Sequence, residues 1–104
     1  MRRGTTPTHE FILPEEITAE LIDEIEIIYA QCETAKLIKK KDDCVIEKNV
    51  VTVKLTQEET FLFAPKIAVK VQVRVLVTSG EVMASDVMRV SCGECLAGDV
   101  LLCE

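Results

Sequence analysis

Aromatic side chains and histidine are scarce in this chain of 104 residues, which has no Trp, one Tyr, three Phe and one His. Proteins that bind single-stranded nucleic acid stack the bases on aromatic rings, and the chain has little to offer for such stacking. Basic residues are also in deficit, because 12 Lys and Arg are set against 18 Asp and Glu, for a net charge of -6. Phosphate backbones bind to basic surfaces, so we expect no nucleic-acid partner.

Long apolar runs are missing as well. No stretch approaches the roughly 20 apolar residues that a transmembrane helix needs. The basic segment from Met1 to Pro7 is not followed by the apolar stretch of a secretory signal. We therefore expect no membrane contact and a location in the cytoplasm or inside a particle that the protein joins. The five cysteines, an odd number, favour free thiols in a reducing compartment over a disulfide framework.

The chain does have a normal apolar content of 48%, which predicts a single folded domain over residues 1–104. Short segments that alternate apolar and polar residues are separated by turn-forming clusters, a pattern typical of an all-β domain. The clearest segment is 67–77, where Ile67 and five valines occupy every second position. Such a strand has one core face and one wetter face.

Further strands are expected at residues 8–13, 35–39, 44–47, 50–55 and 82–90. The segment 23–31 is ambiguous, because Leu21, Ile25 and Ile28 fall at helical spacing. Against a helix, the apolar residues at every second position from Ile25 to Tyr29 indicate a strand. We predict the strand; a helix would change the fold to α+β.

Three connections have recognisable sequences. The lysine-rich stretch 39–43 predicts an exposed hairpin tip between the strands at 35–39 and 44–47. Thr56 and Glu59 have the spacing of a capping box, which predicts one helical turn. The stretch 78–81 contains Gly80 and predicts a tight turn. Asp86 falls on the inward register of the strand at 82–90, where we expect a bulge or a backbone partner for its carboxylate.

Together these elements predict a two-sheet β-sandwich of immunoglobulin-like type, with about seven strands and one short helical turn. Its core would span about residues 8–91 and leave 92–104 as a C-terminal tail. The Cys–Trp–Cys hallmark of true immunoglobulin domains is absent from the sequence.

Cys92 and Cys95 form a Cys-x-x-Cys motif, a spacing that suits two zinc ligands or a redox pair. A structural zinc needs four ligands, and Cys103 is a third candidate, while Cys32, Cys44 and His9 are scattered along the chain. Ordinary thiols are the simpler interpretation. No nucleophile, base and orienting residue can be assembled from the sequence, so we expect a non-enzymatic protein without a cofactor.

An exposed sheet face is the more promising working surface. The outward side of the strand at 67–77 carries Gln72, Arg74 and Leu76, a mixture that suits protein contact better than a substrate pocket. Sandwich domains bind partners by adding strands at an edge or by stacking through a sheet face.

Five segments of the chain carry a resemblance to known sequences: Thr6–Phe11, Tyr29–Gln31, Val53–Thr60, Val71–Leu76 and Ala84–Asp86. They resemble a family of small prophage-encoded proteins from Gram-positive gut bacteria. The resemblance covers roughly residues 3 to 91 and is most specific at Leu55-Thr56-Gln57-Glu58-Glu59-Thr60. The chain departs from the family pattern at Cys32–Ala35, where a glycine-type turn is replaced, and in the cysteine-bearing tail.

The resemblance implies a short β-sandwich encoded among the tail, baseplate or other structural genes of a phage, and it carries over no catalytic residue. The leading hypothesis is therefore a non-enzymatic structural or assembly protein that contacts itself or a phage tail component. The alternatives are a small metal-binding module that uses Cys92, Cys95 and Cys103, and a host-directed accessory protein.

Overall fold

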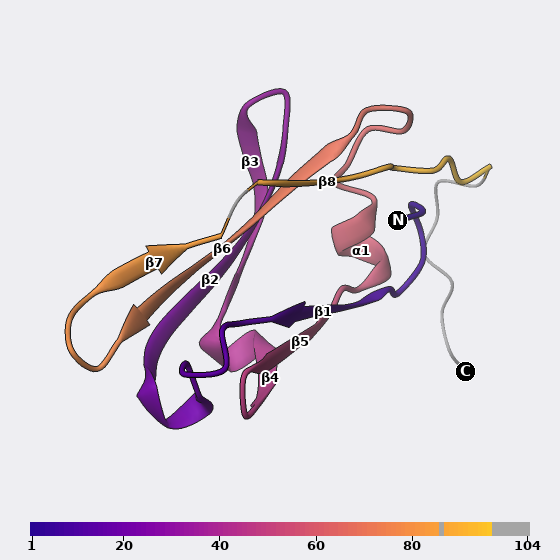
Figure 1. Cartoon of the computed structure of the whole chain (residues 1–104). Helices are drawn as coiled ribbons and strands as arrows, with labels where there is room; N and C mark the ends of the chain where they lie inside the picture. Colours follow the sequence, from indigo (N-terminus) through magenta and orange to yellow (C-terminus); the bar gives the residue numbers. More distant parts are fainter. Residues whose placement is uncertain (86, 97–104) are drawn as a thin grey trace, which may run out of the picture.

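A computed structural model describes residues 1–85 and 87–96, so that Asp86 and Cys103 lie outside the described part of the chain. Two antiparallel sheets face each other (Figure 1). One has three strands in the order β1 (Thr8–Ile12), β5 (Val50–Lys54) and β4 (Cys44–Glu47). The other has five strands: β3 (Thr34–Lys40), β2 (Ile22–Gln31), β6 (Val69–Val77), then β7 (Val82–Ala84) and β8 (Met88–Val90), which both pair with β6. The predicted all-β sandwich is confirmed.

The strand order follows the immunoglobulin-like plan. In that plan one sheet contains the order B-E-D and the other C′-C-F-G. The chain has β1-β5-β4 and β3-β2-β6-β7 in these places, and none of the residues that the structure describes forms a strand at the A position of the first sheet. The N-terminal residues run instead beside the end of the chain, where Arg2 forms a parallel bridge with Gly93.

The ambiguous segment is a strand, as predicted. β2 pairs with β3 on one side and with β6 on the other, and it lies in the middle of its sheet. Its alternation buries Ile25, Ile27 and Tyr29 and turns Glu24 and Glu26 outward. The two-residue period decides the structure because only a strand can bury this set on one face.

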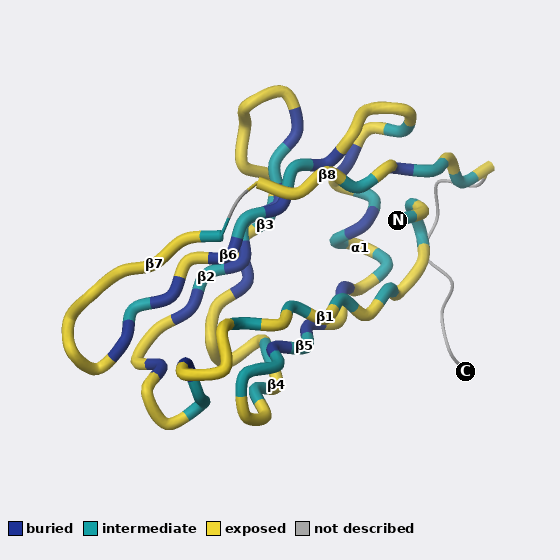
Figure 2. The backbone as a smooth tube through the Cα atoms, in the orientation of Figure 1, coloured by how far each residue is buried: buried dark blue, intermediate teal, exposed yellow. Residues whose placement is uncertain are grey.

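The core lies between the sheets. In Figure 2 buried positions recur along β2 and β6, and the other buried residues of the core come from β5 and the loops. β6 behaves as the alternation predicts, with every valine from Val69 to Val77 turned inward. Phe63 is also buried, whereas Phe61 is half-buried and stacks under the guanidinium of Arg3.

The predicted hairpin around the lysine-rich stretch is wrong. β3 pairs with β2 and β4 pairs with β5, so the 3-10 turn η2 (Lys41–Asp43) carries the chain from one sheet to the other. Lys39 and Lys41 both bind partners where the chain passes between the sheets. Lys39 is 8% exposed and pairs with Glu59 at 2.5 Å, and Lys41 Nζ donates to the Ile22 carbonyl at 2.9 Å.

The single strand predicted at 82–90 is interrupted. Ser85 closes the end of β7, since its N–H donates to the Val73 carbonyl and its hydroxyl accepts from the Val73 N–H. Val82 then lies opposite Leu76 on the side of the sheet turned away from the core, while Met88 lies opposite Val71 on the core side. The prediction of one continuous strand over 82–90 is therefore wrong, because the break between β7 and β8 puts Val82 and Met88 on opposite faces of the sheet.

The helical turn α1 (Gln57–Thr60) forms with its predicted capping box. The Glu59 N–H donates to the Thr56 hydroxyl at 3.2 Å, and the Thr56 N–H donates to the Glu59 carboxylate at 2.8 Å. A second short turn, η1 (Ala19–Leu21), precedes β2. None of the helices in residues 1–85 and 87–96 is long and apolar enough to cross a membrane.

Candidate interaction surface

The predicted residues Gln72, Arg74 and Leu76 lie together on the side of the five-stranded sheet that is turned away from the core, called here the outer face. Residues directly opposite each other on paired strands share a face, so the pairing register gives the neighbours of these three. Across the sheet the rows are Glu24–Leu76–Val82, Lys40–Glu26–Arg74–Ala84, Ile38–Ile28–Gln72 and Ala30–Lys70–Arg89.

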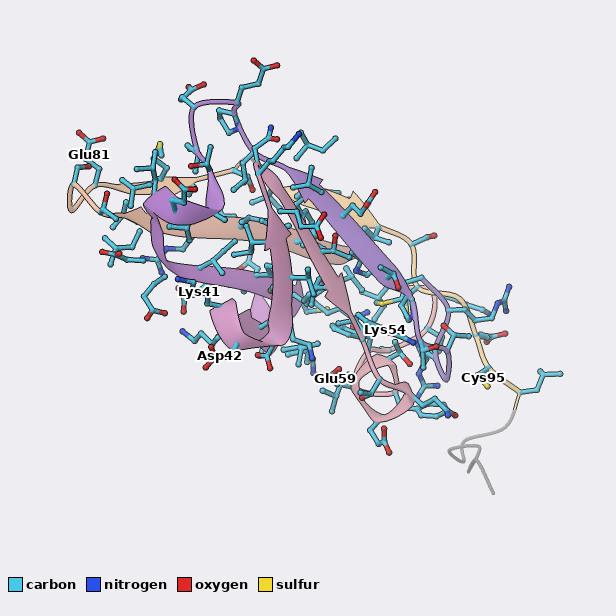
Figure 3. The ribbon with its side chains drawn as sticks, turned by 90° about the horizontal axis from the view of Figure 1, so that it is seen from below. Lys41, Asp42, Lys54, Glu59, Glu81 and Cys95 are labelled. Atoms are coloured by element: carbon cyan, nitrogen blue, oxygen red, sulfur yellow. The ribbon has the colours of Figure 1, made fainter. Side chains whose placement is uncertain are left out.

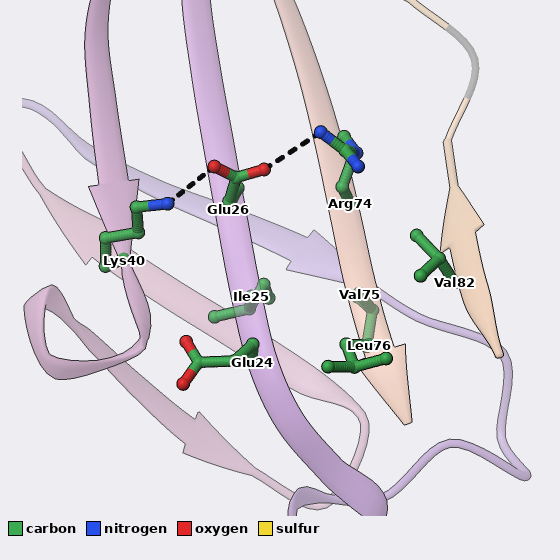
Figure 4. Close-up of a pocket in the computed structure, with 8 residues that line it drawn as sticks. All are labelled: Glu24, Ile25, Glu26, Lys40, Arg74, Val75, Leu76 and Val82. Carbon is green, nitrogen blue, oxygen red and sulfur yellow. Dashed lines mark hydrogen bonds and ion pairs between the residues drawn. The ribbon is translucent and has the colours of Figure 1, made fainter. Parts of the chain in front are cut away.

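An ion-pair network occupies the second row. The Glu26 carboxylate accepts from Lys40 Nζ at 2.5 Å and from Arg74 Nη1 at 3.1 Å (Figure 4). The hydrogen bond from Lys40 lowers the pKa of Glu26, and the charge of Arg74 acts in the same direction. Exposed pairs of this kind contribute little to stability. Their effect is to hold three charged side chains from three strands in one arrangement.

Apolar side chains flank this network on both sides. Val82 is 57% exposed on the side of Glu24, and Ile38 is 44% exposed on the other, with half-buried Leu76 and Ile28 next to them. A hollow of about 220 Å³ lies between β2, β6 and β7. It is lined by the apolar residues Ile25, Val75, Leu76 and Val82 and by the charged residues Glu24, Glu26, Lys40 and Arg74. The outer face therefore combines apolar area with fixed charges.

The two ends of the outer face differ in charge. One end has Glu24 and, at the β6–β7 turn, Glu81, which Figure 3 places at the far end of the molecule from Cys95. The other end has Lys70 and Arg89 in adjacent positions on β6 and β8. Within residues 1–85 and 87–96, neither Glu24 nor Lys70 takes part in an ion pair. The face is thus acidic at one end and basic at the other.

Two polar side chains inside the sandwich, His9 and Tyr29, contact each other. Tyr29 is fully buried, and its hydroxyl lies 2.7 Å from His9 Nδ1 across the two sheets. Burial raises the pKa of Tyr29, helped by the nearby Cys44 and Glu59, and burial lowers the pKa of His9. A protonated phenol that donates to a neutral imidazole fits both shifts.

Glu59, in the helical turn α1, pairs with Lys39 of β3. Burial raises its pKa, but hydrogen bonds from Lys39 and Thr56 outweigh burial and bring the pKa below its ordinary value. Lys39 and Glu59 are both largely covered, with 10% and 20% of their side chains exposed. The pair links β3 to α1 and lines neither of the two hollows found among the described residues.

The structure describes two of the three predicted metal ligands, Cys92 and Cys95. Cys92 is 5% exposed within the core, where burial raises the pKa of its thiol. Cys95 is half-buried beside Gly4 and Phe61, and Cys103 lies outside the described residues. In the described part of the chain, no three His, Cys, Asp or Glu side chains gather as a metal ion would require.

The sequence did not single out Glu24, Glu26 and Lys40 as neighbours of the predicted surface. The alternation in β2 already turned the two glutamates to one face. Their neighbours depend on strand pairing, which sets Lys40 opposite Glu26 on one side and Arg74 opposite it on the other. The chain matches no protein-family model, no curated protein and no solved structure in the three comparisons made.

Proposed function

We propose that the chain is a non-enzymatic protein-interaction module that works through the outer face of the five-stranded sheet, as a structural or assembly component of a phage or prophage. The observation that carries the interaction role is the outer face itself. It combines exposed Val82 and Ile38 with the Lys40–Glu26–Arg74 network on a rigid sheet.

Two physical features support a protein partner. Protein interfaces bury apolar side chains at their centre and favour arginine over lysine, and the outer face offers Arg74 in an inner row with the apolar Leu76 in the next row. The charged network is held in place before any partner arrives, so that little side-chain freedom is lost on binding. The buried polar groups, by contrast, are paired with one another inside the sandwich.

The phage setting rests on the sequence resemblance over residues 3 to 91 and is tested in the phage itself. A strain that carries the gene is induced, and the purified particles are analysed by quantitative mass spectrometry. We expect peptides of this protein at many copies per particle. A protein that is abundant in the lysate but absent from particles would contradict the structural role.

The same analysis of purified particles can test whether the protein uses its outer face when it is incorporated. Leu76→Arg places a charge on the outer face, and Ile12→Arg makes the same kind of change on the three-stranded sheet, where Ile12 is 79% exposed. We expect the first variant to be depleted from particles and the second to be incorporated normally. Equal incorporation of both would contradict the use of the outer face.

A further inference from the structure

We propose that the partner of the outer face is a second copy of this chain, packed face to face with its strands antiparallel, so that Lys70 of each copy enters the hollow beside Glu24 of the other. This inference rests on the proposed function, because it assigns an occupant to the same face. The charge pattern of the outer face, the hollow and the geometry of a two-fold axis support it.

A two-fold interface brings the same patch of both copies together. For two sheets packed face to face, the axis lies in the plane between them, either along the strands or across them. An axis along the strands sets equal ends against each other, Glu24 near Glu24 and Lys70 near Lys70. An axis across the strands sets the acidic end of one copy against the basic end of the other.

The charge pattern favours the second arrangement. Lys70 and Arg89 lie at one end of the outer face and Glu24 at the other, separated by six residues along β6, or roughly 20 Å at the usual rise of a strand. Like charges in contact destabilise an interface, whereas opposite charges steer and orient it. The antiparallel arrangement removes both like-charge contacts at once.

The hollow gives the basic end a place to bind. It lies at the acidic end, between Glu24 and Val82, and its volume of about 220 Å³ is large enough for a lysine side chain. The side chains of Leu76 and Val82 offer apolar surface for the methylene stem of a lysine. Glu24, Lys40 and Arg74 line the same hollow (Figure 4). Glu26 is already held by Lys40 and Arg74, so Glu24 is the carboxylate of this hollow without a basic partner in the described residues.

Sedimentation equilibrium of the purified full chain tests the proposal. A reducing agent is included because Cys32 is exposed. We expect a monomer–dimer equilibrium in which Glu24→Lys and Lys70→Glu each weaken dimerisation about tenfold, because each substitution alters both of the symmetry-related charge pairs. The double variant restores dimerisation to within about threefold of the wild type, because the pair is rebuilt with its charges exchanged.

Matched variants control for net charge. Glu10→Lys and Lys54→Glu make the same charge changes on the three-stranded sheet, where both residues are exposed, and should leave dimerisation unchanged. Circular dichroism and a thermal melt check that each variant is folded.

Two results would overturn the proposal. A wild-type chain that stays monomeric up to about 1 mM would show that the partner is another protein, such as a phage tail component. The proposed function would then still be tested by the particle experiment with Leu76→Arg. A dimer that Glu24→Lys strengthens would show that equal ends meet, since the change would then relieve a repulsion between two glutamates.

Discussion

The side chain of Gln31 and the backbone of Ala64 bind each other in both directions. The Ala64 N–H donates to Gln31 Oε1 at 2.7 Å, and Gln31 Nε2 donates to the Ala64 carbonyl at 2.9 Å and to the Ile67 carbonyl at 3.0 Å. Gln31 is 2% exposed and ends β2. One buried amide therefore joins the centre of the five-stranded sheet to the loop between α1 and β6.

This relationship predicts a large loss of stability in Gln31→Leu. The change removes the partner of three backbone groups whose hydrogen bonds are partly buried, and each such loss costs about 1 kcal/mol. We expect the free energy of unfolding to fall by about 3 kcal/mol or more in urea titrations. Gln72→Leu is the control, since Gln72 makes one hydrogen bond to Ser85 and is half-buried. Similar losses in both variants would contradict the role given to Gln31.

The β2–β3 turn predicts a gain in stability. Cys32 and Glu33 have φ values of 50° and 63°, in the left-handed region that favours Asn and Gly. Glu33→Gly should raise the free energy of unfolding by about 0.5–1 kcal/mol because it removes this strain. Gly80→Ala is the converse change, since Gly80 has a φ of 93° and open space around it, and should destabilise the fold. Loss of stability in Glu33→Gly, measured by thermal unfolding, would contradict the turn geometry.

The Lys39–Glu59 pair predicts a moderate loss of stability in Glu59→Gln. Gln can still accept the Thr56 N–H, so the change mainly removes the partner of a lysine that is 8% exposed. We expect a loss of about 2 kcal/mol, below that of a fully buried pair. Glu58→Gln, on the exposed side of the same turn, should cost less than about 0.5 kcal/mol. Equal losses in the free energy of unfolding for Glu59→Gln and Glu58→Gln would show that the Lys39–Glu59 pair adds nothing to stability.

The contact between His9 and Tyr29 predicts how stability depends on pH. The pKa of His9 is lower in the folded chain than its ordinary value of 6.5, so the unfolded chain binds more protons near that pH. Stability is therefore highest above pH 6.5 and falls as the pH drops below it. Glu26 and Glu59 have pKa values below 4.5 and lose their contribution only at lower pH.

Urea unfolding between about pH 5.5 and 7.5 measures this slope. His9→Gln should flatten it, because Gln can accept the Tyr29 hydroxyl proton but does not titrate. A slope of the same size in the variant would assign the pH dependence to another group.

Local patterns predicted the elements that depend on nearby residues. The alternation from Val69 to Val77, the capping box at Thr56 and the turn at Gly80 are all present. The hairpin around Lys39 was not predictable in the same way, because that lysine is buried by Glu59, twenty residues further along the chain. The break after Ala84 likewise depends on Ser85 binding the backbone of Val73.

The candidate surface could be predicted in part for the same reason. The alternation of β6 placed Gln72, Arg74 and Leu76 on its outer face. Their setting required the register of β2 against β3 and β6, which brings Glu26 between Lys40 and Arg74. The buried position of Gln31 could not be predicted from the sequence. A polar residue is stable at an inward position only with hydrogen-bond partners that the fold supplies.

The most direct measurement of the central claim is a methyl NMR spectrum recorded over a dilution series. If the outer face binds a second copy, the methyl signals of Ile28, Ile38, Leu76 and Val82 shift with concentration. The signals of Ile12 and Val45, which are 79% and 62% exposed on the other sheet, stay in place. Shifts confined to Ile12 and Val45, or none at any concentration, would contradict the assignment of the outer face as the site where two copies meet.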